Sequence, residues 1–237
     1  MKGKLIKYKI FEDILANSCR DMLVIGARQV GKTSLAALAC EQVETALVLT
    51  PSVAMTKANK SKFGKNTFVT HITSKKINKK SWNRDLIILD DMEGMDTRAA
   101  SDVVVKLIEK KLVPIMCLIT PSKVTVNTDN GFPFEVAEWA VECPSCKEVN
   151  SPIGGTTIEE LDQVIKPDGV HCLYCGALLD SVDGFWTHPN AEAYRIPFVA
   201  LPPDEIKFKD LIKRIDSMKA HCPHLMLSDI MARVKGE

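Results

Sequence analysis

The chain has 237 residues, an apolar fraction of 46% and a formal net charge of +1. Such a chain buries roughly 70% or more of its unfolded surface, enough for one good core and a small further module. The composition excludes a disordered chain, and no apolar run approaches the roughly 20 residues that cross a bilayer. Residues 1–11 alternate lysine with apolar residues and lack the continuous apolar centre of a signal peptide. We therefore expect a globular intracellular protein with no membrane partner.

The first motif along the chain is a phosphate-binding loop between a predicted strand and a predicted helix. Residues 22–25 form a short apolar run typical of a buried parallel strand, and residues 32–43 are rich in alanine and leucine, as in a helix. The residues at this junction match the pattern G-x-x-x-x-G-K-[ST] at every fixed position. They are Gly26, Ala27, Arg28, Gln29, Val30, Gly31, Lys32, Thr33 and, one residue further, Ser34.

This pattern predicts a site for a nucleoside triphosphate and Mg²⁺. Gly26 and Gly31 allow the backbone to curl so that its N–H groups face the phosphates. Lys32 brings an ammonium group to the β and γ oxygens, and Thr33 offers a hydroxyl to Mg²⁺. The helix that follows adds its positive N-terminus. The alternative is an ordinary strand-to-helix turn, but the order of strand, loop and helix favours the phosphate site.

A strongly basic stretch follows. Residues 46–51 and 67–71 are apolar runs that predict two more strands. No acidic residue occurs between Glu44 and Asp85, and all charged residues there are basic: Lys57, Lys60, Lys62, Lys65, Lys75, Lys76, Lys79, Lys80 and Arg84. This composition is typical of a surface that faces a polyanion. The alternative is a solvated loop whose lysines only keep the protein soluble.

Residues 85–90 predict a strand that ends in carboxylates. Asp90 has the position of the carboxylate that holds Mg²⁺ in P-loop NTPases, and Asp91 follows as the group that orients the attacking water. Glu93 is the reserve candidate for that role. A helix cap is the alternative, because this acidic segment precedes a predicted helix over residues 98–111. The phosphate loop favours the metal role for Asp90.

Residues 113–119 predict the next strand, and Thr120 follows it. Ligands of open α/β sheets bind beyond the carboxyl ends of the strands, so Thr120 is a candidate for sensing the γ-phosphate. Five short apolar runs separated by helices or loops predict an α/β fold. Its parallel sheet would carry helices on both faces, as in P-loop NTPases of the RecA/ASCE-like class.

Four of the eight cysteines form two C-x-x-C pairs whose spacing suits one tetrahedral Zn²⁺ better than disulfide bridges. They are Cys143, Cys146, Cys172 and Cys175. Gly176 permits a left-handed turn that aims backbone N–H groups at the thiolates. His171 is an alternative ligand to Cys172, but as its direct neighbour we expect it to point away. Four thiolates leave no open coordination position, so the pairs predict a structural zinc module.

Taken together, these motifs resemble the large terminase subunit of tailed bacteriophages, the ATPase that drives DNA into the capsid. Three segments carry the resemblance. Residues 27–33 place arginine and glutamine inside the phosphate loop, as terminases do, and residues 118–122 are similar to the family's coupling motif, a Ser/Thr-Thr-Pro sequence after a strand. Residues 172–203, with Gly184-Phe185-Trp186 and Tyr194-Arg195-Ile196-Pro197, look like the zinc-bearing segment of many phage terminases.

The resemblance implies a role for individual residues and a division of the chain. It implies that the nucleotide is ATP, that Arg28 stabilises charge on the γ-phosphate from within the loop, and that Thr120 is the coupling residue. The corresponding domains are a P-loop ATPase core over residues 1–128, a four-cysteine zinc-ribbon module over 129–190 and a C-terminal lid or linker segment over 191–237.

By the same resemblance, the chain is expected to hydrolyse ATP and to translocate viral double-stranded DNA into a procapsid without regard to sequence. The implied partners are a portal protein, a small terminase subunit and further copies of the chain in a ring, typically a pentamer. The implied location is the cytoplasm of the infected host cell.

Two departures from the family pattern matter. Asp90-Asp91 stands where the family usually has Asp-Glu, and the sequence ends at Glu237 without room for the usual nuclease domain. We therefore expect no nuclease activity from this chain. Either a separate nuclease subunit cuts the DNA, or the chain is an isolated motor portion. Two other interpretations stay open: a AAA-type loader or remodeller, and a zinc-stabilised assembly adaptor that binds nucleotide without turnover.

Overall fold

The structure is a computed structural model, and it describes residues 8–26, 30–75, 77, 82–110, 113–119, 136–153, 158–200 and 212. Within these ranges the chain has an α/β fold with a mixed, mostly parallel sheet and a four-cysteine cluster, as the sequence predicted. Its contacts define two compact units. The first holds the described residues of 14–24 and 31–120, and the second holds those of 7–13, 25–30 and 121–237.

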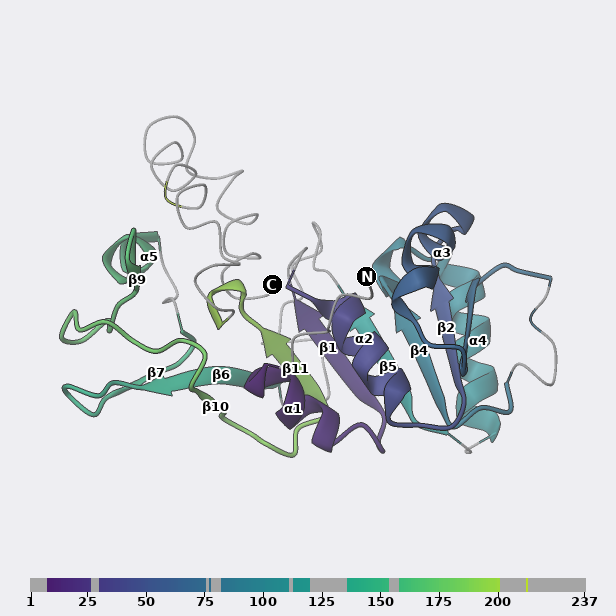
Figure 1. Cartoon of the computed structure of the whole chain (residues 1–237), viewed down its shortest axis with the longest axis horizontal. Helices are drawn as coiled ribbons and strands as arrows, with labels where there is room; N and C mark the ends of the chain where they lie inside the picture. Colours follow the sequence, from purple (N-terminus) through teal and green to yellow (C-terminus); the bar gives the residue numbers. More distant parts are fainter. Residues whose placement is uncertain are drawn as a thin grey trace. The chain divides into compact units, whose positions relative to one another are not determined.

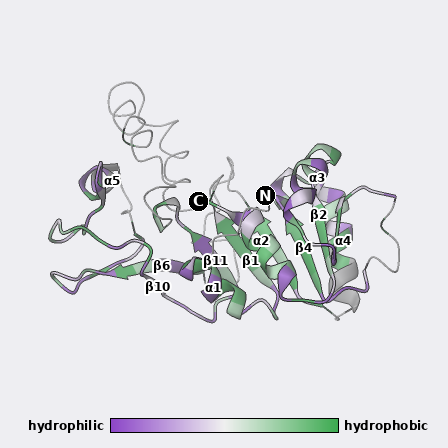
Figure 2. Cartoon of the chain, viewed as in Figure 1, coloured by the Kyte–Doolittle hydropathy of each residue, from purple (hydrophilic) through white to green (hydrophobic). Residues whose placement is uncertain are grey.

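The first unit is built on neighbouring strands in the order β1-β5-β4-β2-β3. Their bounds are β1 (Met22–Gly26), β2 (Ala46–Thr50), β3 (Thr67–His71), β4 (Leu86–Asp90) and β5 (Ile115–Ile119). β2 pairs in parallel with β3 and β4, and β4 pairs in parallel with β5. Every residue of β2 and β4 is buried, as expected of parallel strands covered on both faces. These strands stand out as hydrophobic in Figure 2.

Helices cover both faces of this sheet. They are α2 (Lys32–Glu41), α3 (Val53–Asn59) and α4 (Thr97–Lys110) (Figure 1). The short 3₁₀ turn η1 (Lys60–Lys62) follows α3, and η2 (Met92–Gly94) lies between β4 and α4. Side chains alternate along a strand, so Leu47 and Leu89 lie on one face, where they pack in a cluster with Val103 of α4. Asp90 lies on the opposite face, and its carboxylate contacts Thr33 at the start of α2.

Two polar side chains fix the ends of these helices. Asn66 donates hydrogen bonds of 2.9 Å to the backbone oxygens of Cys40 and Val43, which satisfies carbonyls at the end of α2. Asp96 accepts a hydrogen bond of 2.8 Å from the backbone N–H of Ala99 and thereby caps α4. The helix-capping role that the sequence left open for the acidic strand end therefore belongs to Asp96.

The second unit is arranged around β6 (Val136–Glu142). β6 pairs in parallel with β11 (Ala193–Ile196) and antiparallel with β10 (Phe185–Trp186) and β7 (Val149–Asn150). The remaining elements are α5 (Ile158–Val164), β8 (Ile165–Lys166), β9 (Gly169–Val170) and η3 (Phe198–Ala200). Helix α1 (Lys9–Ala16) begins in this unit and ends in the first. β11 lies in the segment predicted as a lid or linker, and the predicted boundaries at residues 128 and 190 stay predictions.

Aromatic side chains form the core of the second unit. Trp139 and Trp186 stack edge to face with ring centroids 5.3 Å apart, and Trp186 meets Tyr194 in the same way at 5.0 Å. Trp139 and Tyr194 are fully buried. Each finds a hydrogen-bond partner for its polar atom: Trp139 donates to the backbone oxygen of Ser181, and Tyr194 donates to that of Pro189.

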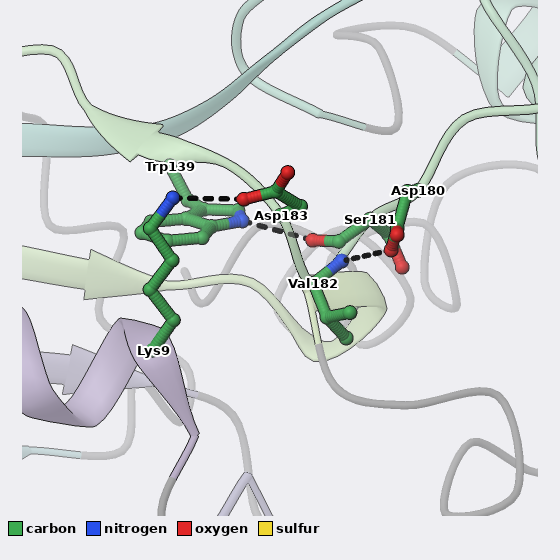
Figure 3. A network of polar contacts seen from close by, with 6 residues as sticks. All are labelled: Lys9, Trp139, Asp180, Ser181, Val182 and Asp183. Atoms are coloured by element: carbon green, nitrogen blue, oxygen red, sulfur yellow. Dashed lines mark hydrogen bonds and ion pairs between the residues drawn. The ribbon is translucent and has the colours of Figure 1, made fainter.

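The loop over residues 180–184 closes around Trp139 (Figure 3). Asp180 accepts a hydrogen bond from the backbone N–H of Val182, and Asp183 pairs with Lys9 of α1 at 2.9 Å. This ion pair is exposed, so its contribution to stability is small. A side chain at Gly184 has no room, because its Cβ would lie 2.6 Å from the indole of Trp139.

No described helix has both the length and the apolar character that crossing a membrane requires.

Leu47→Ala tests the core on the α4 side of the sheet. Leu47 is fully buried, so the substitution removes apolar contacts and leaves a cavity, and we expect the free energy of unfolding to fall by about 2–5 kcal/mol. Urea unfolding followed by far-UV circular dichroism measures it. Val105→Ala is the control, because Val105 is 51% exposed on α4 and its loss should change stability by less than about 0.5 kcal/mol. Equal effects of the two substitutions would contradict this assignment of the core.

Candidate functional site

The described part of the phosphate loop folds back on itself. Val30 is fully buried, and a Cβ at Gly26 would lie 2.7 Å from its side chain and 3.5 Å from the backbone oxygen of Ile196 in β11. Only glycine therefore fits at residue 26. Gly31 has φ 86° and ψ 15°, a left-handed conformation that glycine adopts without strain, and α2 starts at the next residue. Close packing therefore favours glycine at residue 26, and backbone conformation favours it at residue 31.

Two side chains at the start of α2 lie at the end of β4. Lys32 is buried, and the Thr33 hydroxyl lies 3.3 Å from each carboxylate oxygen of Asp90. Thr33 and Asp90 are 57 positions apart in the sequence, so the fold brings the two predicted Mg²⁺ ligands together. Ser34 follows in the same turn and is half-buried.

Asp90 is a carboxylate held out of water. It is 2% exposed, and burial, together with the charge of Asp91, raises its pKa above the ordinary value. The hydrogen bond from Thr33 and the positive charges of Lys32 and Lys62 lower that pKa and offset part of the effect. Burying the ionised carboxylate costs free energy unless a neighbouring group stabilises the negative charge, and a bound cation would stabilise it directly.

Asn59 is a further residue at the site, and it belongs to none of the sequence motifs. It is buried at the end of α3, and its amide Nδ2 lies 3.4 Å from Asp90 Oδ2. A helical spacing puts Asn59 on the inner side of α3 together with Thr56, three residues earlier. That spacing, following the strand that ends at Thr50, was the one signal that could have pointed to it.

A network of hydroxyl groups at the end of β2 positions α3. Ser52 caps the helix by accepting a hydrogen bond of 3.3 Å from the backbone N–H of Met55. The hydroxyls of Thr50 and Thr56 lie 2.7 Å apart, and both bond the backbone oxygen of Ser52. The strand end and the first turn of α3 are therefore locked together, which fixes the place from which Asn59 reaches Asp90.

Two residues, Asp91 and Glu93, are candidates for the second carboxylate, which would orient the attacking water. Asp91 has φ 64° and ψ 52°, a left-handed conformation that aspartate adopts more readily than most residues. A Cβ added at Gly94 would lie 3.5 Å from the Asp91 carboxylate, so this side chain lies over the η2 turn. Glu93 is exposed within the same turn. Both are near the end of β4, and their assignment as water-orienting groups stays a prediction.

The predicted residues Ala27, Arg28, Gln29 and Thr120 lie outside the described residues.

The donor atoms at this site suit Mg²⁺. A hydroxyl and a carboxylate supply the oxygen ligands that Mg²⁺ prefers, and it keeps several waters when it binds through one or two protein groups. Thr33 and Asp90 would hold the ion, and Lys32 is near enough to affect the charge of Asp90.

The four predicted cysteine ligands converge in the second unit. The sulfur atoms of Cys143, Cys146, Cys172 and Cys175 all lie within 4.8 Å of one another. The Cys143–Cys175 and Cys146–Cys172 sulfurs are 3.5 and 3.6 Å apart. Four thiolates at about 2.3 Å from one Zn²⁺ would be about 3.8 Å apart, so this arrangement fits a structural zinc ion.

The two cysteine pairs have the same backbone turn. The N–H of Lys147 bonds the oxygen of Cys143 at 3.0 Å, and the N–H of Gly176 bonds that of Cys172 at 2.9 Å. Lys147 and Gly176 are both left-handed, with φ 66° and 73°. The prediction that Gly176 supplies a left-handed turn is confirmed. The first pair makes the same turn with a lysine.

Asn150 links the two pairs and is a second residue that the sequence did not reveal. It lies on β7 beside the first pair and is buried. Its Nδ2 lies 3.5 Å from the Cys172 sulfur, and its Oδ1 accepts a hydrogen bond of 2.9 Å from the backbone N–H of Leu173. Burial alone would raise the pKa of the Cys172 thiol, but the Asn150 bond and backbone N–H groups favour the thiolate and lower that pKa to about 6.

His171 points away from the cysteine cluster, as expected. Its Nδ1 lies 2.8 Å from the Gly176 backbone oxygen, and its Nε2 lies 3.0 Å from the Asp168 carboxylate. Both ring nitrogens are therefore engaged elsewhere. Among the described residues, the four cysteines form the one group of three or more potential metal ligands.

No protein-family model matches this chain, and no curated protein matches it. The assignment of the α/β fold and the four-cysteine cluster rests on the structure of this chain alone.

Asp90→Asn tests the cost of the buried charge in the metal-free protein. Because the folded-state pKa of Asp90 is above its ordinary value of 3.8, the folded protein holds a proton that the unfolded chain releases. Stability is therefore lost as the pH rises from that value through the folded pKa. The asparagine variant lacks this loss, so we expect its free energy of unfolding to fall less with pH. Urea unfolding in EDTA across this range measures it.

The exposed Asp102→Asn of α4 is the matched control and should follow the wild type. If Asp90→Asn also followed the wild-type pH profile, Asp90 would not carry a raised pKa.

Asn150→Ala tests the support of the metal ligands. Residues that bond a metal ligand without touching the metal typically contribute 10–100-fold to metal affinity. We expect a zinc affinity lower by that factor and one zinc still bound at saturation, measured by chelator competition and elemental analysis. His171→Gln should retain the wild-type affinity, because His171 faces away from the sulfurs. A weaker affinity in His171→Gln and an unchanged one in Asn150→Ala would reverse the two roles.

Proposed function

We propose that this chain binds ATP and Mg²⁺ at the phosphate loop, hydrolyses the ATP, and uses the reaction to move double-stranded DNA as the motor subunit of a viral packaging machine. The observation that carries the nucleotide part is the contact between the Thr33 hydroxyl and the buried Asp90 carboxylate. It joins the phosphate-loop motif to the acidic strand end, which are the two parts that P-loop NTPases use to hold Mg²⁺.

The chain's own groups would share the work as follows. Mg²⁺, when bound, neutralises charge on the β and γ oxygens of the nucleotide. Lys32 and the backbone N–H groups at the start of α2 hold the phosphates by charge and dipole. Asp91 or Glu93 accepts a hydrogen bond from the attacking water and orients it. Arg28 is proposed to stabilise charge that develops on the γ-phosphate, and Thr120 to couple hydrolysis to movement.

The packaging part of the proposal rests on the resemblance to terminases and on two further features. The basic stretch after α2 suits the phosphate backbone of DNA, which needs no base contact. The four-cysteine module fits a structural Zn²⁺, as the resemblance requires. A portal protein, a small terminase subunit and a ring of identical chains are the partners that this function would need.

Two other functions are each supported by a feature of the sequence. The phosphate loop and an Asp-Asp strand end also occur in AAA-type loaders and remodellers, which would form hexamers and act on a helicase. An assembly adaptor that binds nucleotide without turnover is compatible with an aspartate where the family has glutamate. The AAA-type alternative leaves the cysteine module and the segment around Trp186 unexplained.

Phosphate release by the purified full chain tests the enzyme claim. We expect the wild type to hydrolyse ATP in a Mg²⁺-dependent way, and Lys32→Ala to be slower by roughly 10²–10³-fold because it loses charge stabilisation of the transferred phosphoryl group. Asp91→Asn and Glu93→Gln identify the water-orienting carboxylate, since one should lose most of the rate and the other little. Lys75→Ala, at an exposed lysine of the same unit, is the control.

The same assay separates the functions. Duplex DNA should raise the wild-type rate, and the effect should not depend on its sequence. If wild type, Lys32→Ala and Asp91→Asn were equally inert while a fluorescent ATP analogue still bound, the adaptor would replace the motor. Hydrolysis that duplex leaves unchanged, in a hexameric protein, would favour the remodeller.

A further inference from the structure

The segment formed by α3 and η1 has one face turned to the nucleotide site. Thr56, Asn59 and Phe63 follow each other at intervals of three and four residues, so they share one side. Thr56 bonds Thr50 at the end of β2, Asn59 reaches Asp90, and Phe63 is buried. This side is therefore fixed both to the strand ends of the sheet and to the predicted metal ligand.

The other face of the same segment is basic and exposed. Lys57 and Lys60 are three residues apart, which puts them on a common side of the helix, and both are exposed. Lys62 and Lys65 are exposed as well. No acidic residue occurs in this stretch of the sequence, so their charges are not offset by carboxylates nearby along the chain.

We infer that the α3–η1 segment is the DNA-contacting element of this chain, and that Asn59 couples its position to the state of Asp90. The inference rests on the proposed function and deepens it: within the long basic stretch it selects Lys57 and Lys60 as contacts to the phosphates of duplex DNA. We choose duplex DNA as the partner because of charge complementarity. Exposed lysines in a stretch without acidic residues suit a polyanion, and lysines that contact phosphates do not distinguish base sequences.

The coupling follows from the two faces of one short helix. Mg²⁺ held at this site would give the Asp90 carboxylate a new partner, and the bond that Asn59 donates to the same carboxylate would then adjust. Asn59 is the last residue of α3, and η1 begins with Lys60. A change in the Asn59 bond is therefore passed directly to the residue beside it, which faces outward. Asn59 is in this sense a positioning residue that acts through Asp90.

The first experiment measures duplex binding as a function of salt by fluorescence anisotropy, with two unrelated sequences and the full chain. Each phosphate contact contributes about 0.9 to the slope of log K against log salt. The double variant Lys57→Gln/Lys60→Gln is expected to reduce the slope by about 2, equally for both sequences. Arg20→Gln, at an exposed residue before β1 and outside the basic stretch, is the matched control and should keep the wild-type slope. A wild-type slope in the double variant overturns the assignment of the surface.

The second experiment measures how much duplex stimulates hydrolysis, with each variant compared with its own rate without DNA. Asn59→Ala is expected to lose most of the stimulation and to shift the Mg²⁺ concentration for half-maximal rate, while it keeps the wild-type salt slope of DNA binding. Ser101→Ala, at an exposed position of α4, should keep all three properties. Thermal unfolding confirms that each variant is folded.

Stimulation and Mg²⁺ dependence like those of the wild type in Asn59→Ala overturn the coupling. If the wild type itself releases no phosphate, the proposed function fails, whereas the salt slopes still decide whether Lys57 and Lys60 bind DNA. The two failures are therefore distinguishable.

Discussion

A negative charge held out of water organises the first unit. Asp90 ends a strand that is buried along its whole length, so its carboxylate cannot turn to solvent. An ionised group in such a place needs partners, and the fold supplies them from two helices: Thr33 from the start of α2 and Asn59 from the end of α3. Each helix is in turn fixed at its own end, α2 by the glycine turn at Gly31 and α3 by the Ser52 cap. The site is thus the meeting point of elements that a parallel sheet brings to its carboxyl edge.

In the second unit sulfur ligands complement a modest apolar core. The aromatic cluster of Trp139, Trp186 and Tyr194 fills the space around β6, and beyond it short strands and turns bury smaller aliphatic side chains such as Val164 and Val170. β6 leads directly into Cys143, so the cysteine cluster starts where the aromatic core ends. Metal binding by such a cluster supplies free energy that a segment of this size cannot gain from packing alone.

The sequence predicted the sheet well, because buried parallel strands are short uninterrupted apolar runs. β3 has the predicted bounds, and the other four strands of the first unit differ from theirs by one or two residues. The convergence of Thr33 with Asp90, and of the four cysteines, was also predictable, since both follow patterns with fixed spacing. Asn59 and Asn150 were not, because a buried amide has no signature along the chain. Its partner is chosen by packing between elements, and for Asn59 and Asn150 that partner is 31 and 22 positions away.

The unequal turns of the cysteine cluster have a consequence for the stability of its two halves. A left-handed turn has almost no steric cost for glycine, but it costs a residue with a side chain on the order of 1 kcal/mol. The loop that ends at Gly176 therefore adopts its folded shape without this cost, whereas the loop that ends at Lys147 carries it. The half of the cluster that holds Cys143 and Cys146 thus depends more on the contacts around it than the half that holds Cys172 and Cys175.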